Sequence, residues 1–112
     1  MADTGAMGHN VWGLGYNLYM DFEWHSAKAI TNLQKHGVSF EEAKSVFSDE
    51  HAVIFVDEAH SALEPRELLI GHSSKSRLLL VSFTERSGSI RIISARTATR
   101  QERKDYEENT QF

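Results

Sequence analysis

Hydrophobic residues at every third position predict a first helix over residues 26–36. Ala27, Ile30 and Leu33 share this spacing and would form one buried face of the helix. Basic residues followed by a glycine, at positions 35–37, end the pattern. Basic side chains suit the negative end of a helix, and glycine adopts the left-handed conformation that often closes one.

A second helix is predicted immediately after the first. Ser39 and Glu42 have the spacing of a capping box, in which each side chain bonds the backbone N–H of the other residue. Hydrophobic residues with helical spacing then form the predicted buried face: Phe40, Ala43, Val46 and Phe47. The two helices and their short connection would make a helical hairpin.

Four hydrophobic runs predict β-strands over residues 51–57, 66–72, 76–85 and 89–95. The connections between them are too short for helical crossovers, so the sheet should be largely antiparallel. From Thr97 the pattern becomes helical and highly charged. The order predicts an α+β fold, with two N-terminal helices packed on a four-stranded, largely antiparallel sheet and a C-terminal helix after it.

Strict alternation along the last strand would separate its two arginines. One face would carry Arg96 together with Ile90, Ile92 and Ser94. Arg91 would point to the other face with Ile93. On this pattern the two arginines would have different roles, one lining a site and the other supporting the fold.

The 112 residues are enough for one domain with a modest core. Residues 1–19 contain four of the seven glycines, almost no charge and no clear period, and Met20 opens a denser pattern. We interpret residues 20–112 as the domain and residues 1–19 as an N-terminal extension that is not native to it. The alternative is a genuine N-terminal arm that packs on the body.

Charge is unevenly distributed, although the whole chain carries a formal net charge of −4. Residues 1–65 contain three lysines and ten acids, whereas residues 66–104 contain nine lysines or arginines and three acids. Seven of those nine are arginine, which binds phosphate through two hydrogen bonds. The basic segment fits a nucleic-acid partner and fits equally well solvated strands whose arginines pair with acids.

The sequence excludes several kinds of site. It has no cysteine, so it forms no disulfide, thiolate metal site or cysteine nucleophile. The six histidines lack the spacing of a metal-ligand set, and we expect no metal or other cofactor. No hydrophobic run approaches the roughly 20 residues of a membrane span, and there is no signal peptide. We therefore expect a cytoplasmic protein without a membrane partner.

The remaining arginine, glutamate, histidine and tyrosine residues favour RNA cleavage without a metal. In that reaction the 2′-hydroxyl attacks the adjacent phosphorus and a base removes its proton. Cations stabilise the phosphorane, and an acid protonates the leaving 5′-oxygen. The same composition would also suit a surface that binds RNA or a protein partner without catalysis.

Several separate motifs resemble the BrnT family of toxins, within the RelE-like superfamily. The matching segments cover almost all of residues 20–107: FEW at 22–24, NLQKHGVSFEEAKSVF at 32–47, HSALEPR at 60–66, IGHSSKSRLL at 70–79, FTER at 83–86 and IRIISARTATRQER at 90–103. The resemblance implies a RelE-like fold and an endoribonuclease that halts translation, as the toxin of a type II toxin–antitoxin system. It also implies a hetero-oligomer with a BrnA-like DNA-binding antitoxin, through which the complex binds operator DNA.

The resemblance, together with the basic segment, implies a set of site residues. Catalytic roles would belong to Glu64, Arg66, Arg86, Arg96 and His36, and RNA-binding roles to Lys35, Arg77, Arg91 and Arg100. The base would be either His36 or Glu64. The chain departs from the family at His25, where an acid is usual, at Glu50, where proline is common, and at Pro65, where a second acid is typical. His25 is therefore assigned no role.

Three functions compete at this stage. The first is a ribonuclease toxin with an antitoxin partner, favoured by the resemblance and by the arginine-rich segment. The second is a catalytically inactive module that binds the antitoxin and acts as a co-repressor; it would tolerate changes at Glu64, Arg66 and Arg96. The third is a structural domain without a nucleic-acid role, which the charge asymmetry disfavours.

Overall fold

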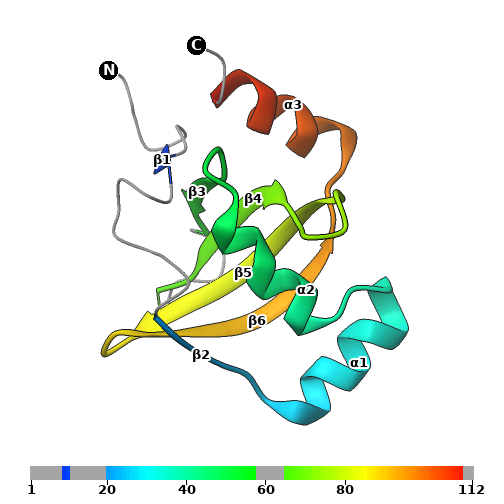
Figure 1. The fold of residues 1–112 in the computed structure, drawn as a ribbon, viewed down its shortest axis with the longest axis vertical. Helices are drawn as coiled ribbons and strands as arrows, with labels where there is room; N and C mark the ends of the chain where they lie inside the picture. Colours follow the sequence, from blue (N-terminus) through cyan, green and yellow to red (C-terminus); the bar gives the residue numbers. More distant parts are fainter. Residues whose placement is uncertain (1–8, 11–19, 58–64, 110–112) are drawn as a thin grey trace.

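The computed structural model describes residues 9–10, 20–57 and 65–109. These residues form one mixed sheet of six strands in the order β1-β3-β4-β5-β6-β2 (Figure 1). The strands are β1 (His9–Asn10), β2 (Asp21–Glu23), β3 (Val53–Val56), β4 (Glu67–His72), β5 (Leu78–Arg86) and β6 (Ser89–Thr97). The helical elements are α1 (Ser26–His36), α2 (Phe40–Ser45), the 3-10 turn η2 (Val46–Ser48) and α3 (Arg100–Asn109).

The α+β class is confirmed, but a four-stranded sheet is wrong. The four predicted strands are present as the antiparallel series β3 to β6. Two further strands flank them: β1 pairs antiparallel with β3, and β2 pairs parallel with β6. Strands of two and three residues are too short to produce a recognisable alternation in the sequence. Since β1 lies within residues 1–19, the proposed domain boundary at Met20 stays a prediction.

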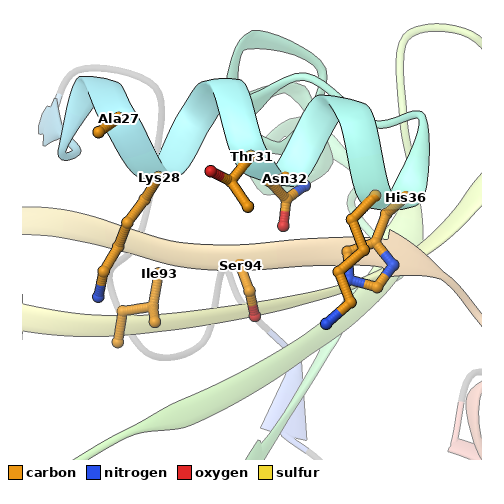
Figure 2. A pocket seen from close by; sticks show the side chains of 8 residues that line it. Ala27, Lys28, Thr31, Asn32, His36, Ile93 and Ser94 are labelled. Carbon is orange, nitrogen blue, oxygen red and sulfur yellow. The ribbon is translucent and has the colours of Figure 1, made fainter.

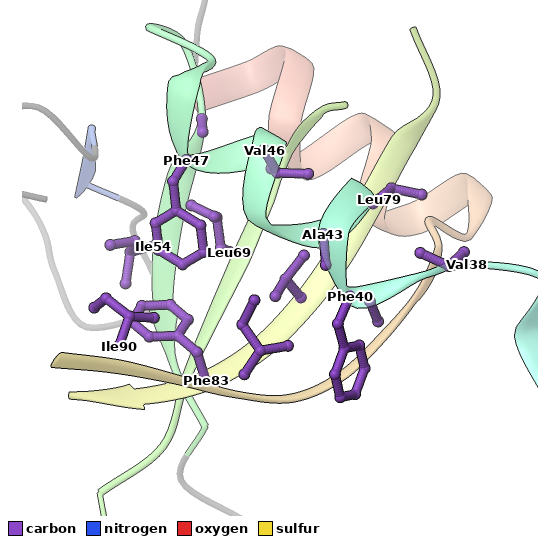
Figure 3. Packing of buried hydrophobic residues seen from close by; sticks show 14 residues of the cluster. Val38, Phe40, Ala43, Val46, Phe47, Ile54, Leu69, Leu79, Phe83 and Ile90 are labelled. Carbon is purple, nitrogen blue, oxygen red and sulfur yellow. The ribbon is translucent and has the colours of Figure 1, made fainter. Parts of the chain in front are cut away.

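The main hydrophobic core lies between α2 with η2 and one face of the sheet (Figure 3). The predicted buried face of the second helix is confirmed, because Phe40, Ala43, Val46 and Phe47 are all buried. Phe47 is the centre of this packing and makes edge-to-face ring contacts with Phe22 of β2 and with Phe83 of β5. This face of the sheet, the core face, is therefore closed to solvent.

The opposite face of the sheet is only partly covered, by α3. Tyr106 is the buried residue of this helix and packs with Leu78, Leu80 and Ile70. Its hydroxyl donates a hydrogen bond to the Asp49 carboxylate over 3.1 Å. Burial, reinforced by the Asp49 charge, raises the pKa of Tyr106, so the hydroxyl keeps its proton and remains a donor. We call this side the open face.

The prediction that Ala27, Ile30 and Leu33 form the buried face of the first helix is wrong. Ile30 and Leu33 are 60% and 51% exposed, whereas the buried residue of α1 is Asn32. The partly buried Ala29 is the hydrophobic residue of α1 that packs against the main core. The Asn32 side chain bonds the backbone of Ala95, which places α1 along the edge of β6 beyond the end of β2.

The strand β6 contains a β-bulge that changes the direction of its side chains. Ser94 lies opposite Ser82, but Ile92 lies opposite the next residue of β5, Phe83. Ile93 is thus an additional residue without a partner in register. Arg91 and Arg96 therefore both point to the open face, and the prediction that they lie on opposite faces is wrong because it assumed strict alternation.

No helix of the described residues has the length and hydrophobicity needed to cross a membrane. Nor do the described residues contain a cluster of three or more His, Asp or Glu side chains that could hold a metal ion.

Candidate functional site

A depression of about 400 Å³ lies on the open face of the sheet, beside the start of α3. We call it the arginine hollow. It is lined by Asp57, Arg66, Leu68, Leu80, Ser82, Ser94, Arg96 and Glu102. Strand pairing explains this arrangement: Leu68 lies opposite Ser82 and Ser82 opposite Ser94, while Leu80 lies opposite Arg96. Two guanidinium groups and two hydroxyls, from separate strands and the segment before β4, therefore converge on one surface.

The backbone on either side of Arg66 is held in place by the sheet. The carbonyl of Pro65 accepts a 2.6 Å hydrogen bond from the Thr84 hydroxyl on β5. The carbonyl of Arg66 accepts one from the Asp57 N–H over 3.0 Å. The ring of Pro65 also fixes its own φ angle, directly before Arg66. Arg66 thus enters the hollow from a segment with little freedom, which suits a residue that must meet a ligand in one geometry.

Arg96 is held by Glu102 of α3. Its two terminal nitrogens donate to the two carboxylate oxygens of Glu102, each over 2.8 Å. Glu102 also belongs to a capping box at the start of α3: its backbone N–H donates to the Thr99 hydroxyl, and its carboxylate accepts from the Thr99 N–H. One side chain therefore begins the helix and binds the arginine.

The protonation states of this pair follow from its geometry. Burial raises the pKa of Glu102, but the hydrogen bonds from Arg96 and Thr99 outweigh it, and the pKa lies below its ordinary value. The same hydrogen bond to Glu102 raises the pKa of Arg96. The pair is consequently fully charged near neutral pH, and a phosphate that binds the same two N–H groups of Arg96 must displace the carboxylate.

A second depression of about 320 Å³ lies between α1 and β6 (Figure 2). We call it the lysine pocket, and it is lined by Ala27, Lys28, Thr31, Asn32, Lys35, His36, Ile93 and Ser94. Two of the predicted site residues, Lys35 and His36, therefore lie together here, apart from Arg66 and Arg96. Ser94 lines both depressions, so they adjoin at this residue.

Arg77 has a partner in the fold. Its guanidinium donates two hydrogen bonds to the carboxylate of Glu42 on α2 and a third, over 3.0 Å, to the carbonyl of Gly37. The Glu42 side chain is only 2% exposed and also accepts from the Ser73 hydroxyl. The predicted capping box is confirmed only in its Ser39 half, where the Ser39 hydroxyl accepts from the Glu42 N–H. The Glu42 carboxylate binds Arg77 instead of the backbone at the helix start. This geometry favours a structural role for Arg77.

The other predicted site residues are dispersed. Arg86 lies opposite Ser89 at the end of the β5–β6 hairpin, four residues and roughly 13 Å of strand beyond Ser82. Arg91 forms an exposed ion pair of 3.3 Å with Glu23 on β2. Arg100 is the exposed first residue of α3. Glu64 lies outside the described residues.

Three ionisable residues of the two depressions were not predicted from the sequence. Glu102 could have been found, because Thr99 and Glu102 have the spacing of a capping box that marks a helix start. Asp57 and Lys28 carry no local signal, since only the pairing of strands and the packing of α1 on β6 bring them to the depressions.

The arginine hollow has groups for phosphate chemistry. Arg66 and Arg96 can stabilise an oxyanion on phosphorus, and the hydroxyls of Ser82 and Ser94 can hydrogen-bond phosphate or ribose oxygens. Asp57 supplies a carboxylate that can accept a proton. The arginine hollow is lined by no aromatic side chain, and the lysine pocket has only the imidazole ring of His36, so both suit the backbone of a nucleic acid better than its bases.

Comparisons with known proteins agree with this chemistry. A family model described as a ribonuclease toxin, BrnT, of type II toxin–antitoxin system matches residues 24–102. The fold is similar to the crystal structure of the Brucella abortus ribonuclease toxin BrnT, with a TM-score of 0.57 and 26% sequence identity. That match covers 72% of this chain and 99% of the Brucella chain. A search of curated proteins gave no match.

Proposed function

The chain belongs to the BrnT family of ribonuclease toxins of type II toxin–antitoxin systems, and from this we propose that it is an endoribonuclease that cleaves RNA in the arginine hollow. The reaction needs no metal ion. The 2′-oxygen attacks the adjacent phosphorus, the bond from phosphorus to the 5′-oxygen breaks, and the products carry a 2′,3′-cyclic phosphate and a 5′-hydroxyl.

The convergence of Arg66 and Arg96 on one hollow carries this proposal. Negative charge grows on the phosphorane oxygens during attack, and two fixed guanidinium groups stabilise it more strongly than they stabilise the ground-state phosphate. The hydroxyls of Ser82 and Ser94 lie beside them and orient the ribose and phosphate oxygens. Arg96 becomes available when the RNA displaces Glu102.

Two carboxylates are candidates for the base that removes the 2′-proton. Asp57 lines the hollow beside Arg66. Glu64 precedes Arg66 by two residues and is the candidate from the sequence. His36 lies in the lysine pocket, on the far side of Ser94, and is less well placed for this role. Separate Asp57→Asn and Glu64→Gln variants identify the base as the residue whose replacement abolishes the acidic limb of the pH profile of kcat/KM.

In the cell this activity would inhibit translation by destroying mRNA. A BrnA-like DNA-binding antitoxin would neutralise it by covering the basic surface of residues 66–104, and the complex would repress its operon through operator DNA. The net charge of that segment, nine basic residues against three acids, supports an acidic partner surface. An interface confined to residues 20–57 would contradict this part of the proposal.

The test is cleavage of a single-stranded RNA by the purified chain in the presence of a chelator, with identification of the product ends. We expect cyclic phosphate ends for the wild type. Arg66→Ala and Arg96→Gln should each lower the rate of the chemical step by about 10²-fold or more, the effect of removing one oxyanion donor. Arg103→Ala is the matched control, because Arg103 is exposed on α3 and lines neither depression.

Two results would overturn the proposal. If folded Arg66→Ala and Arg96→Gln variants cleave as fast as Arg103→Ala, the hollow is not the active site. If the wild type cleaves no RNA and does not arrest growth when produced alone, the protein is the inactive alternative, an antitoxin-binding co-repressor. The pairing of Arg96 with Glu102 in this structure is the observation that keeps this alternative in view.

A further inference from the structure

The lysine pocket adjoins the arginine hollow and has a uniform charge. Among its lining residues the groups that can carry charge are Lys28, Lys35 and His36, all of them basic. The helix that supplies them, α1, contains no acidic residue. In the part of the chain that the structure describes, neither Lys28 nor Lys35 makes an ion pair. The pocket thus presents two lysines that make no ion pair within the described residues.

The direction of these side chains is set by α1. Lys28 and Lys35 are two turns apart on the helix, and Figure 2 shows Lys28 and His36 extending from α1 toward β6 on either side of Ser94. Asn32 lies between them but is already saturated, since its amide bonds Ala95 and Val38. The fixed amide therefore holds the helix in place, and the lysines remain available to a ligand.

The bulge in β6 connects the two depressions. The additional residue, Ile93, forms part of the wall of the lysine pocket, and Ser94 after it faces both depressions. Bulges near active sites commonly redirect a side chain in this way. A chain of phosphates that passes Arg66 and Arg96 and crosses β6 at Ser94 would enter the lysine pocket, whose lining includes Lys28 and Lys35.

We propose that the lysine pocket is a second phosphate subsite, which binds the phosphate next to the scissile one in single-stranded RNA. The proposal rests on the proposed function of the arginine hollow and extends it by one nucleotide. Two lysines and the Thr31 hydroxyl supply donors to phosphate oxygens. No Phe, Tyr or Trp side chain lines the pocket, and its one aromatic ring is the imidazole of His36, so the subsite binds the RNA backbone more than the base.

The experiment compares 2′-deoxy oligonucleotides, which bind but cannot be cleaved. A dinucleotide has one internal phosphate and occupies the hollow alone, whereas a trinucleotide has a second phosphate for the pocket. We expect the wild type to bind the trinucleotide more tightly than the dinucleotide. The Lys28→Ala/Lys35→Ala variant should lose this gain while binding the dinucleotide like the wild type. For the trinucleotide, the slope of log K against log salt concentration should also be smaller in magnitude by about 0.7 in the double variant than in the wild type.

Cleavable RNA supplies a second readout. For the trinucleotide the double variant should raise KM and leave kcat unchanged, because the subsite binds ground state and transition state alike. Lys75→Ala is the matched control: Lys75 is an exposed lysine on the β4–β5 turn and lines neither depression. It should change none of these values.

The failure of this proposal differs from the failure of the proposed function. The pocket is an ordinary solvated surface if the double variant gains as much affinity from the second phosphate as the wild type does. The same conclusion follows if Lys75→Ala loses as much of this gain as the double variant. If the wild type binds neither oligonucleotide, both proposals are wrong.

Discussion

The side-chain amide of Asn32 bonds both backbone polar groups of Ala95, as a neighbouring β-strand would. The Ala95 N–H donates to the amide oxygen over 3.1 Å, and the amide nitrogen donates to the Ala95 carbonyl over 2.8 Å. The remaining amide hydrogen bonds the carbonyl of Val38 over 2.9 Å. One side chain thus continues the sheet where β2 ends, and it protects an edge that would otherwise be open to other strands.

Replacing Asn32 should be among the most destabilising changes on α1. Asn32→Ala removes three hydrogen bonds from buried backbone groups, each worth about 1 kcal/mol, so the free energy of unfolding should fall by about 3 kcal/mol. Urea unfolding at pH 7 measures this change. Gln34→Ala, at an exposed position of the same helix, should stay within about 0.5 kcal/mol of the wild type. Equal losses in the two variants would contradict the role given to the amide.

Stability should fall in acid because of Glu42. The hydrogen bonds from Arg77 hold the pKa of Glu42 below its ordinary value of 4.5 in the folded protein. As the pH falls below about 4.5, the unfolded chain therefore binds this proton first, and stability is lost as the pH passes through the lower folded pKa. Unfolding free energies between pH 7 and pH 3 should show this decline.

The Glu42→Gln variant separates this contribution from those of other carboxylates. It should lose about 2 kcal/mol at pH 7, less than a fully buried pair because Arg77 reaches solvent. Its stability should also decline less between pH 5 and pH 3 than that of the wild type. Glu41→Gln changes the exposed neighbouring glutamate and is the control. Parallel pH profiles for wild type and Glu42→Gln would show that Glu42 is not the titrating group.

Removing the charge of Glu102 should strengthen RNA binding. In the proposed complex, phosphate competes with the Glu102 carboxylate for the two terminal nitrogens of Arg96, and a neutral amide competes less well. We expect Glu102→Gln to bind a 2′-deoxy oligonucleotide several-fold more tightly than Glu108→Gln. The control removes the same unit of charge from an exposed position of α3. Fluorescence anisotropy at fixed salt gives both affinities, and equal values would mean that Glu102 does not compete with RNA.

Gly71 should not tolerate a side chain. A methyl group on its Cα would lie 2.7 Å from the Ala52 Cβ and 2.9 Å from the Val46 Cγ1. Gly71→Ala should therefore lower the unfolding free energy by about 1–3 kcal/mol through overpacking. Ala52→Gly removes the closest contact. Gly71→Ala should therefore lower the unfolding free energy less in the Ala52→Gly background than in the wild type. A double-mutant cycle with no coupling would show that the strain lies elsewhere.

The sequence predicts some helix faces well and others badly, for a physical reason. In α2 and η2 the burial of Phe40 and Phe47 follows from hydrophobic spacing, because burying the large rings removes much apolar surface from water. In α1 the apolar spacing of Ile30 and Leu33 is misleading, because an amide that meets the edge of β6 decides which side faces inward. Hydrogen bonds to a distant strand edge leave no period in the sequence.

The sequence predicts which types of residue form the candidate site better than it predicts how they are arranged in space. Arg66 and Arg96 do meet in one hollow, from segments 30 residues apart in the sequence. Arg77 belongs instead to the contact between Glu42 and the β4–β5 turn, a pairing over 35 positions that composition does not reveal. The common direction of Arg91 and Arg96 depends on the bulge, and nothing in the local sequence distinguishes a bulged strand from a regular one.

Because Ile93 is a bulge residue with no partner in register on β5, β6 is one residue longer than its pairing with β5 requires. A chain shortened by Ile93 would become a regular strand in which Ile92 still faces the core and Ser94 and Arg96 still face outward. The deletion would therefore remove a wall of the lysine pocket and leave the orientation of the arginines intact. The strand length at this point is an adjustable dimension of the molecule, through which the spacing between the two depressions can be varied without redesigning the core.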